Sequence, residues 1–181
     1  MARVLVLFAH PSFSKSRVHQ RLVDAVPDHP DLTFRDLYEE YPDFHVNVPA
    51  EQALLSSHDV IVFQHPIYWY SVPPLLKQWI DLVLEHGWAY GREGRALEGK
   101  RVLSAVSTGG PESSYQREGF HGRTLSEFLA PIERTVTLCR MEYLEPFVVY
   151  GTHRLSEEDV GHEAERYRSW LLALLENGAG A

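Results

Sequence analysis

A tyrosine and a histidine stand six residues apart in the segment STGGPESSYQREGFHG, residues 107–122, which follows the apolar run RVLSAV. The hydroxyl of Tyr115 can donate a hydrogen bond, and His121 can gain or lose a proton near neutral pH, so the pair suits proton transfer beside a ligand. The structural alternative is that Tyr115 packs against a neighbour and His121 caps the next helix. Taken alone, the residue types favour that alternative.

The same segment begins with Thr108, Gly109 and Gly110 directly after a predicted buried strand. Glycines at such a position let a flat ring approach the backbone closely. The spacing is not that of the G-x-G-x-x-G dinucleotide fingerprint. A plain glycine-rich turn would explain the two glycines equally simply.

A second candidate site lies in HPSFSKSRVHQ, residues 10–20, where Ser12, Ser14 and Ser16 precede a predicted helix. Hydroxyl groups together with the free N–H groups of a helix N-terminus form a good phosphate site. The spacing excludes the Walker A loop, which requires G-x-x-x-x-G-K-[ST]. An ordinary helix cap in a polar loop is the alternative, and the segment alone does not decide between them.

The third candidate is HPIYWYSVPP, residues 65–74, in which Tyr68, Trp69 and Tyr70 follow a buried strand. Aromatic residues in this position more often belong to a core or an interface. The prolines at both ends of the segment stiffen it, which suits a preformed platform for a flat ligand.

Strands and helices alternate along the chain, which predicts an α/β fold. Continuous apolar runs indicate strands covered on both faces, and the alternating run at residues 32–38 indicates an edge strand. The predicted strands are Val4–Phe8, Leu32–Tyr38, Val60–Phe63, Val102–Val106 and Phe147–Tyr150. Helices are predicted around residues 18–26, after Pro73-Pro74 up to a C-cap at His86-Gly87, around 125–132, and after a capping box at Ser156 and Asp159.

These elements predict a flavodoxin-like, doubly wound, five-stranded parallel sheet of order 2-1-3-4-5, forming one domain over residues 1–181. In such a sheet, ligands bind at the carboxyl ends of the strands, so the loops after strands one, three and four should surround one site. These are the three candidate loops. One suits a phosphate and two suit a planar ring, which makes flavin mononucleotide (FMN) the natural ligand.

The composition limits the class of protein further. The net charge of −8 argues against a nucleic-acid partner, and no apolar stretch approaches the roughly 18 residues of a membrane span. The single cysteine, Cys139, allows no intramolecular disulfide and is expected to be buried. We expect a cytoplasmic protein, and we assign no metal ligands.

Several motifs resemble the NAD(P)H:quinone oxidoreductase family of flavodoxin-like flavoproteins. They are FAHP (8–11), YPDF (41–44), QHPIYWYSVPPLLKQWID (64–81), HGWAYG (86–91) and STGG (107–110), in the order and spacing of the family over most of the chain. Within the family, the chain is most similar to the ancillary flavoprotein subunits of bacterial glutathione-gated potassium efflux systems.

This resemblance implies a bound flavin and a homodimer with two active sites at the subunit interface. The flavin phosphate and ribityl chain should meet His10 and Ser16, Arg17, Val18 and His19. The ring should rest on Ile67, Tyr68, Trp69 and Tyr70 and on Ser107, Thr108, Gly109 and Gly110. The spacing and the GFHG context match Tyr115 and His121 to the catalytic pair beside the flavin pyrimidine. FMN is favoured over FAD because the FAD enzymes of the family are longer.

The implied reaction is a ping-pong transfer of two electrons, as hydride, from NADH or NADPH through flavin N5 to a quinone. Tyr115 would donate to the charge that grows at flavin N1 and O2, and His121 would hold or supply the proton. The competing interpretation is a regulatory subunit attached to the inner face of a potassium efflux antiporter, and the two roles are compatible. A one-electron flavodoxin is the third and less favoured interpretation.

Overall fold

The computed structural model describes residues 1–177, so the last four residues of the predicted domain, 178–181, lie outside it. The strands are β1 (Val4–Phe8), β2 (Leu32–Asp36), β3 (Val60–Pro66), β4 (Arg101–Ser107), β5 (Glu142–Tyr143) and β6 (Phe147–Val149). The α-helices are α1 (Arg17–Asp24), α2 (Leu37–Glu40), α3 (Val48–Ser57), α4 (Pro74–Val83), α5 (Leu125–Leu138) and α6 (Glu157–Asn177). Two short 3-10 helices cover Phe13–Lys15 and Glu112–Tyr115.

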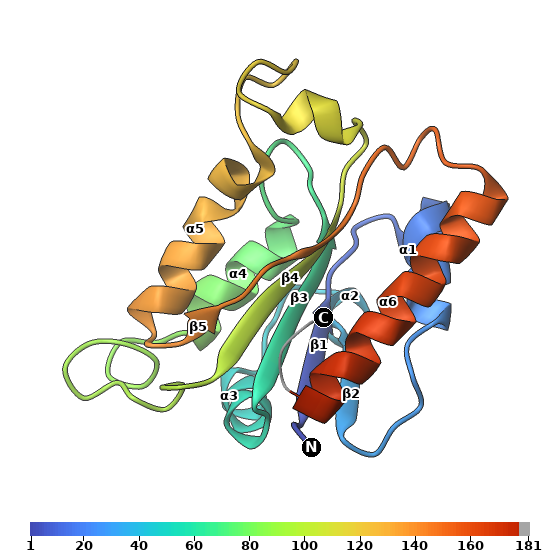
Figure 1. The fold of residues 1–181 in the computed structure, drawn as a ribbon. Helices are drawn as coiled ribbons and strands as arrows, with labels where there is room; N and C mark the ends of the chain where they lie inside the picture. Colours follow the sequence, from blue (N-terminus) through green and yellow to red (C-terminus); the bar gives the residue numbers. More distant parts are fainter. Residues whose placement is uncertain (178–181) are drawn as a thin grey trace.

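All the strand pairs are parallel, and the order is β2-β1-β3-β4-β5, as the sequence predicts (Figure 1). The fifth position is shared by two short segments, because β5 pairs with the beginning of β4 and β6 pairs with its end. Residues 144–146 separate them, and Pro146 has no N–H to give to a ladder. The alternating run predicted as an edge strand does form the edge at β2.

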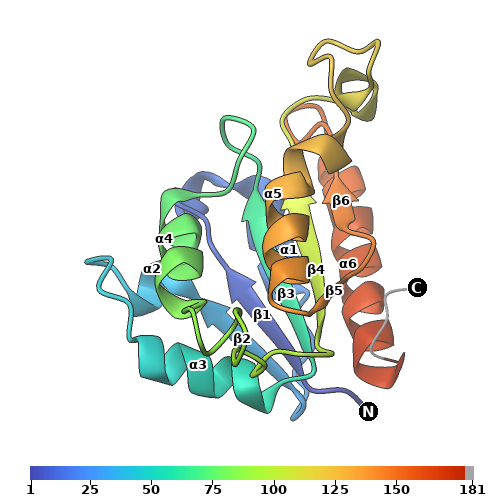
Figure 2. The same cartoon turned by 90° about the vertical axis from the view of Figure 1, so that its left-hand side faces the viewer.

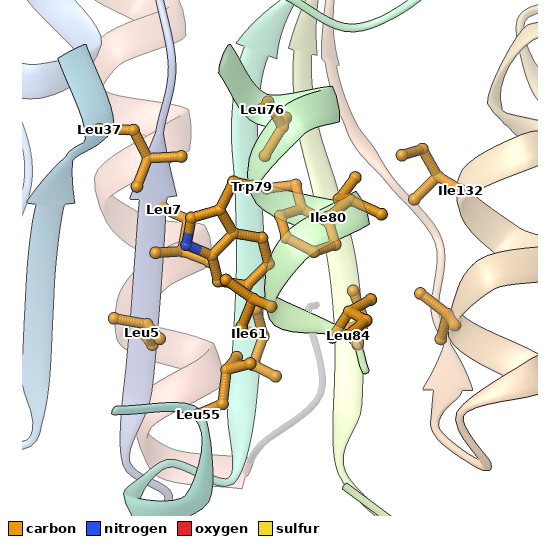
Figure 3. Close-up of a cluster of buried hydrophobic side chains, with 14 of the residues drawn as sticks. Leu5, Leu7, Leu37, Leu55, Ile61, Leu76, Trp79, Ile80, Leu84 and Ile132 are labelled. Carbon is orange, nitrogen blue, oxygen red and sulfur yellow. The ribbon is translucent and has the colours of Figure 1, made fainter. Parts of the chain in front are cut away.

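Helices cover both faces of the sheet (Figures 1 and 2). Side chains alternate between the faces along a strand, so Leu5 and Leu7 of β1 pack toward α3, α4 and α5 while Val4 and Val6 pack toward α1 and α6. The first face is built around Trp79 of α4, which is fully buried among leucines and isoleucines (Figure 3). This double coverage explains why the central strands read as continuous apolar runs.

Several predicted boundaries differ from the structure. The strand predicted to reach Tyr38 ends at Asp36, because the Asp36 carboxylate accepts from the N–H groups of Tyr38 and Glu39 and starts α2. Helix α4 ends at Val83, not at Gly87, whose N–H instead bonds Tyr90 in the following turn. Helix α3 was not predicted at all.

Two local predictions are confirmed. The Ser156 hydroxyl accepts from the Asp159 N–H at 3.1 Å, while the Asp159 carboxylate accepts from the Ser156 N–H at 2.9 Å, so the capping box before α6 is present. Cys139 is buried, and burial raises the pKa of its thiol, as expected for a small core residue.

Candidate functional site

A cavity of about 870 Å³ opens at the carboxyl edge of the sheet, where the three candidate loops meet. Eight of the predicted cofactor-binding residues line it: His10, Ser16, Arg17, Val18, Ile67, Tyr68, Ser107 and Gly109. Its remaining lining residues are Ser12, Lys15, Pro66, Thr152, His153 and Leu155. The volume lies in the range of small-molecule and cofactor sites.

The N-terminus of α1 forms one end of this cavity. Ser16 caps the helix by accepting from the N–H of His19 at 3.2 Å. Within residues 1–177, the N–H groups of Arg17 and Val18 have no hydrogen-bond partner, as is usual in the first turn of a helix. Free N–H groups at a helix start, next to the ammonium group of Lys15, suit an anionic phosphate.

The guanidinium of Arg17 points toward the loop before α6. It donates to the carboxylate of Glu157 at 2.6 Å and to the carbonyl of Leu155 at 2.5 Å. Arg17 therefore offers its backbone N–H to the cavity, while its side chain holds a neighbouring loop.

His10 presents a hydrogen-bond donor to the cavity. Its Nδ1 accepts from the Ser12 N–H at 3.1 Å, so the hydrogen of the neutral ring is on Nε2. His10 is 5% exposed, and burial lowers the pKa of its imidazole. A neutral donor at this place suits a polar ligand atom.

His19 lies beneath the cavity and does not line it. Its Nε2 is 2.8 Å from the Ser107 hydroxyl, while its Nδ1 has no partner within the described residues. Burial, with His10 and His65 nearby, lowers the pKa of His19 well below its usual value. A hydrogen on Nδ1 would be a buried N–H without a partner, so the favoured tautomer carries its hydrogen on Nε2 and donates it to the Ser107 hydroxyl. The hydrogen of the Ser107 hydroxyl is then free to bond a ligand.

The aromatic loop after β3 is a two-residue hairpin. The backbone groups of Tyr68 and Ser71 bond each other in both directions, and both central residues have positive φ, 48° for Trp69 and 64° for Tyr70. Tyr68 lines the cavity, and the ring of Tyr70 stacks on Phe128 at 5.0 Å. Trp69 contributes nothing to the cavity and is 93% exposed.

The loop after β4 brings Tyr115 and His121 together, with ring centroids 4.6 Å apart. A Cβ at Gly110 would lie 3.4 Å from Tyr115 Cε2 and 3.6 Å from His121 Nε2, so both rings face this glycine. Neither lines the cavity, and neither do Gly110 or the buried Thr108. The pair therefore stands one residue beyond the cavity wall formed by Gly109.

Burial raises the pKa of Tyr115, against a smaller opposite effect of Thr108. The suggestion that His121 caps the next helix is wrong, because Thr124 caps α5 and forms a capping box with Glu127. His121 instead belongs to an aromatic cluster with Tyr70, Tyr115, Phe120 and Phe128. This segment projects beyond the rest of the domain (Figures 1 and 2).

The sequence analysis missed a fourth segment of the site, in the loop between β6 and α6. Thr152, His153 and Leu155 line the cavity, and the side chain of His153 is exposed there. The available signal was the position of GTH directly after the last strand, since that loop opens at the same edge as the other three.

The donors at this cavity fit FMN. The lining of the cavity includes helix N–H groups and a lysine, which suit a dianionic phosphate, and Ile67 and Gly109, which suit a flat ring. The lining also includes two neutral donors, the Nε2–H of His10 and the hydroxyl of Ser107. Across residues 1–177, no group of three or more His, Cys, Asp or Glu side chains is arranged to hold a metal ion.

The fold and this site define a flavodoxin-like protein. The chain belongs to the Flavodoxin_2 family, described as having a flavodoxin-like fold, whose model matches residues 2–171. Among curated proteins, it is 46% identical to general stress protein 14 of Bacillus subtilis, over 93% of this chain and 97% of that one. It is 44% identical to the glutathione-regulated potassium-efflux system ancillary protein KefG of Salmonella paratyphi B, over 94% of this chain and 93% of that one.

Solved structures also show similarity to flavodoxin-like proteins. General stress protein 14 from Treponema denticola, solved in complex with FMN, has a TM-score of 0.90 and 43% identity, covering 95% of this chain and 99% of that one. An NADPH-quinone reductase from P. pentosaceus has a TM-score of 0.83 and 31% identity, covering 93% and 96%. Both the sequence-based family and the predicted fold are therefore confirmed.

No helix in the described part of the chain is both long and apolar enough to span a bilayer.

Proposed function

We propose that the protein is an FMN-dependent NAD(P)H:quinone oxidoreductase. The observation that carries the proposal is the cavity itself, which joins a phosphate-type helix start to a flat-walled end in a fold whose relative binds FMN. Bound FMN would accept a hydride from a nicotinamide and pass two electrons to a quinone. The similarity to an NADPH-quinone reductase supports this class of reaction.

The residues of the cavity would bind and orient the cofactor. The N–H groups of Arg17 and Val18 would bind the phosphate, and the neutral donors of His10 and Ser107 would bind other polar atoms of the cofactor. Because hydrogen bonds fix His10 and Ser107 and the helix fixes the N–H groups of Arg17 and Val18, little reorganisation is needed on binding. Ile67 and Tyr68 would exclude water from one side of the ring.

Tyr115 and His121 would act at the open end of the site. They are held against Gly110 by an aromatic cluster and flank the cavity wall. The Tyr115 hydroxyl is protonated at neutral pH, since the ordinary pKa of tyrosine is about 10 and burial raises the pKa of Tyr115 further, so it can donate to negative charge that develops beside it. His121, whose ring lies 4.6 Å from that of Tyr115 between centroids, would hold or supply the proton.

A second copy of the chain would complete the substrate pocket. Trp69 projects into solvent beside the cavity, and Phe120 is also 88% exposed. Large apolar side chains exposed together at a site commonly mark an interface. We therefore expect a homodimer in which these aromatic residues cover the site of the partner subunit.

The proposal is tested with purified protein. We expect about one FMN per chain, released by heat and identified by chromatography, and oxidation of NADH or NADPH that depends on an added quinone. A protein that remains colourless after incubation with FMN would refute the cofactor assignment. Bound FMN without any quinone-dependent oxidation would leave the fold and cofactor but refute the enzymatic role.

A regulatory role is supported separately by the 44% identity to KefG over almost the whole chain. We propose as a second function that the protein is an ancillary subunit of a glutathione-gated potassium efflux antiporter, located at the inner face of the membrane. Co-expression with such an antiporter should increase potassium efflux and allow both proteins to be purified together. Unchanged efflux and no co-purification would exclude this role.

A further inference from the structure

The loop after β6 is tied to the glycine loop by backbone hydrogen bonds. The N–H of Gly151 donates to Gly110 at 2.9 Å, and the N–H of Thr152 donates to Thr108 at 3.0 Å. Gly151 has a φ of +67°, which turns the chain at this point. These contacts place the next residue, His153, directly at the cavity wall.

His153 lies against Gly109. A Cβ at Gly109 would be 2.9 Å from His153 Nε2 and 3.0 Å from its Cδ2, and it would meet no other atom within 4 Å. The backbone of Gly109 does not have the positive φ that would require glycine. The absence of a side chain at Gly109 therefore makes room for the imidazole of His153.

The other end of the loop is held by Arg17. Its guanidinium bonds the carbonyl of Leu155 and the carboxylate of Glu157, two and four residues beyond His153. The backbone is thus held on both sides of His153, and its exposed imidazole lies at the cavity wall with no hydrogen-bond partner for its nitrogens among residues 1–177. An imidazole that lines a cavity, lies against a residue without a side chain and has free nitrogens is suited to contact a ligand bound there.

We propose that the side chain of His153 contacts the bound flavin and closes the cavity between the phosphate and the ring of the cofactor. Gly109 has no side chain, and the imidazole of His153 occupies the space that this leaves. The proposal rests on the FMN binding proposed above. His153 is a flat wall and a hydrogen-bond donor to the cofactor, and Arg17 positions it through Leu155. It thereby adds the loop after the last strand to the three loops predicted from sequence.

The first test measures FMN affinity of the apoprotein by quenching of free FMN fluorescence. We expect His153→Ala to weaken binding about tenfold, which corresponds to about 1.4 kcal/mol. His162→Ala is the matched control, since His162 is an exposed histidine on α6 away from the cavity, and it should leave the affinity unchanged. Equal affinity of His153→Ala and wild type would overturn the proposal.

The second test is a double-mutant cycle between Gly109→Ala and His153→Ala. If the new methyl group acts by displacing the imidazole, each single change weakens FMN binding about tenfold and the double variant is no worse than either. If Gly109 instead serves only close approach of the ring to the backbone, the two losses multiply to about 100-fold. That multiplication would refute the pairing of Gly109 with His153.

The outcomes separate this proposal from the one it rests on. Wild-type protein that binds no FMN would refute both. Wild-type protein that binds FMN with the same affinity as His153→Ala would refute only the role of His153. Matching far-ultraviolet circular dichroism and melting temperatures of the apoproteins would show that a lost affinity is not caused by misfolding.

Discussion

The carboxylate of Glu51 is expected to be one of the main stabilising groups of the fold. It is completely buried, accepts from Arg35 Nε at 2.7 Å and from the Tyr41 hydroxyl at 2.5 Å, and accepts on its other oxygen from Trp79 Nε1 at 2.8 Å. These bonds join α3, β2 and α4. Helix α4 directly follows the aromatic loop, so this network also supports one wall of the cavity.

We predict that Glu51→Gln lowers the free energy of unfolding by about 3 kcal/mol. An amide keeps only one acceptor oxygen, so either Trp79 or the pair of donors from Arg35 and Tyr41 faces an NH₂ group. An unsatisfied buried donor costs roughly 1–3 kcal/mol, and a buried charge that loses its partner costs roughly 3–5 kcal/mol. Arg35 retains a second partner, Glu40 at 3.1 Å, which keeps the expected loss near the lower end.

The assay is equilibrium unfolding in urea. With a slope of about 2 kcal/mol per molar urea, the midpoint should fall by about 1.5 M while the slope stays unchanged. Glu98→Gln is the matched control, because Glu98 also pairs with an arginine, Arg95 at 2.6 Å, but on the surface. The control should leave the urea midpoint nearly unchanged, because a fully exposed ion pair contributes little to stability.

A third variant, Tyr41→Phe, removes one donor and leaves the charge, and it should cost about 1 kcal/mol. The reasoning therefore predicts an order: Glu51→Gln is most damaging, then Tyr41→Phe, then Glu98→Gln. If Glu51→Gln is no worse than the surface control, the buried network does not stabilise the fold.

Three further predictions concern the site and its surroundings. Tyr115→Phe and His121→Gln should leave FMN content intact, and at least one should slow single-turnover flavin reduction by NAD(P)H by about tenfold to 10³-fold in stopped flow; wild-type rates in both would mean that the pair only packs. Trp69→Asn should not destabilise the chain, because the side chain is 93% exposed and asparagine accepts positive φ more readily, but it should weaken the proposed homodimer, with sedimentation as the measurement. Burial lowers the pKa of His65 to about 4 from its ordinary 6.5, so the unfolded chain binds more protons between these values. Stability should therefore fall as the pH drops from about 6.5 to 4, by up to about 3 kcal/mol from this residue, and urea midpoints that stay constant over this range would contradict it.

The central strands were predictable because their side chains are buried on both faces, which leaves a continuous apolar run. Helix α3 was not, since its buried residues are Leu55 and the carboxylate Glu51, and a charged residue on the inner face hides the apolar period. The remaining signal was local: Asn47 accepts from the N–H of Ala50 as an N-cap, and Pro49 stands in the first turn.

The site was predictable as a set of loops but not as a set of side-chain directions. The fold class alone places the ends of parallel strands at one edge, which is why residues from three distant segments line one cavity. Spacing along the chain does not say which way a loop residue points. Tyr115 and His121 face Gly110, whereas His153, from a loop that was not considered, faces Gly109 and the cavity.

The residues at the turn of the aromatic loop, Trp69 and Tyr70, are not those that the backbone conformation of the turn prefers. Two-residue hairpins with positive φ at both positions usually carry asparagine and glycine, and other residues there cost of order 1–3 kcal/mol each. The stacking of Tyr70 on Phe128 offsets part of that cost, but Trp69, at 93% exposure, has no comparable packing contact among residues 1–177. A large apolar side chain kept on a strained backbone in solvent is best explained by a contact outside the chain, beside the cavity that Tyr68 lines. This is the physical reason to expect that a second copy completes the site.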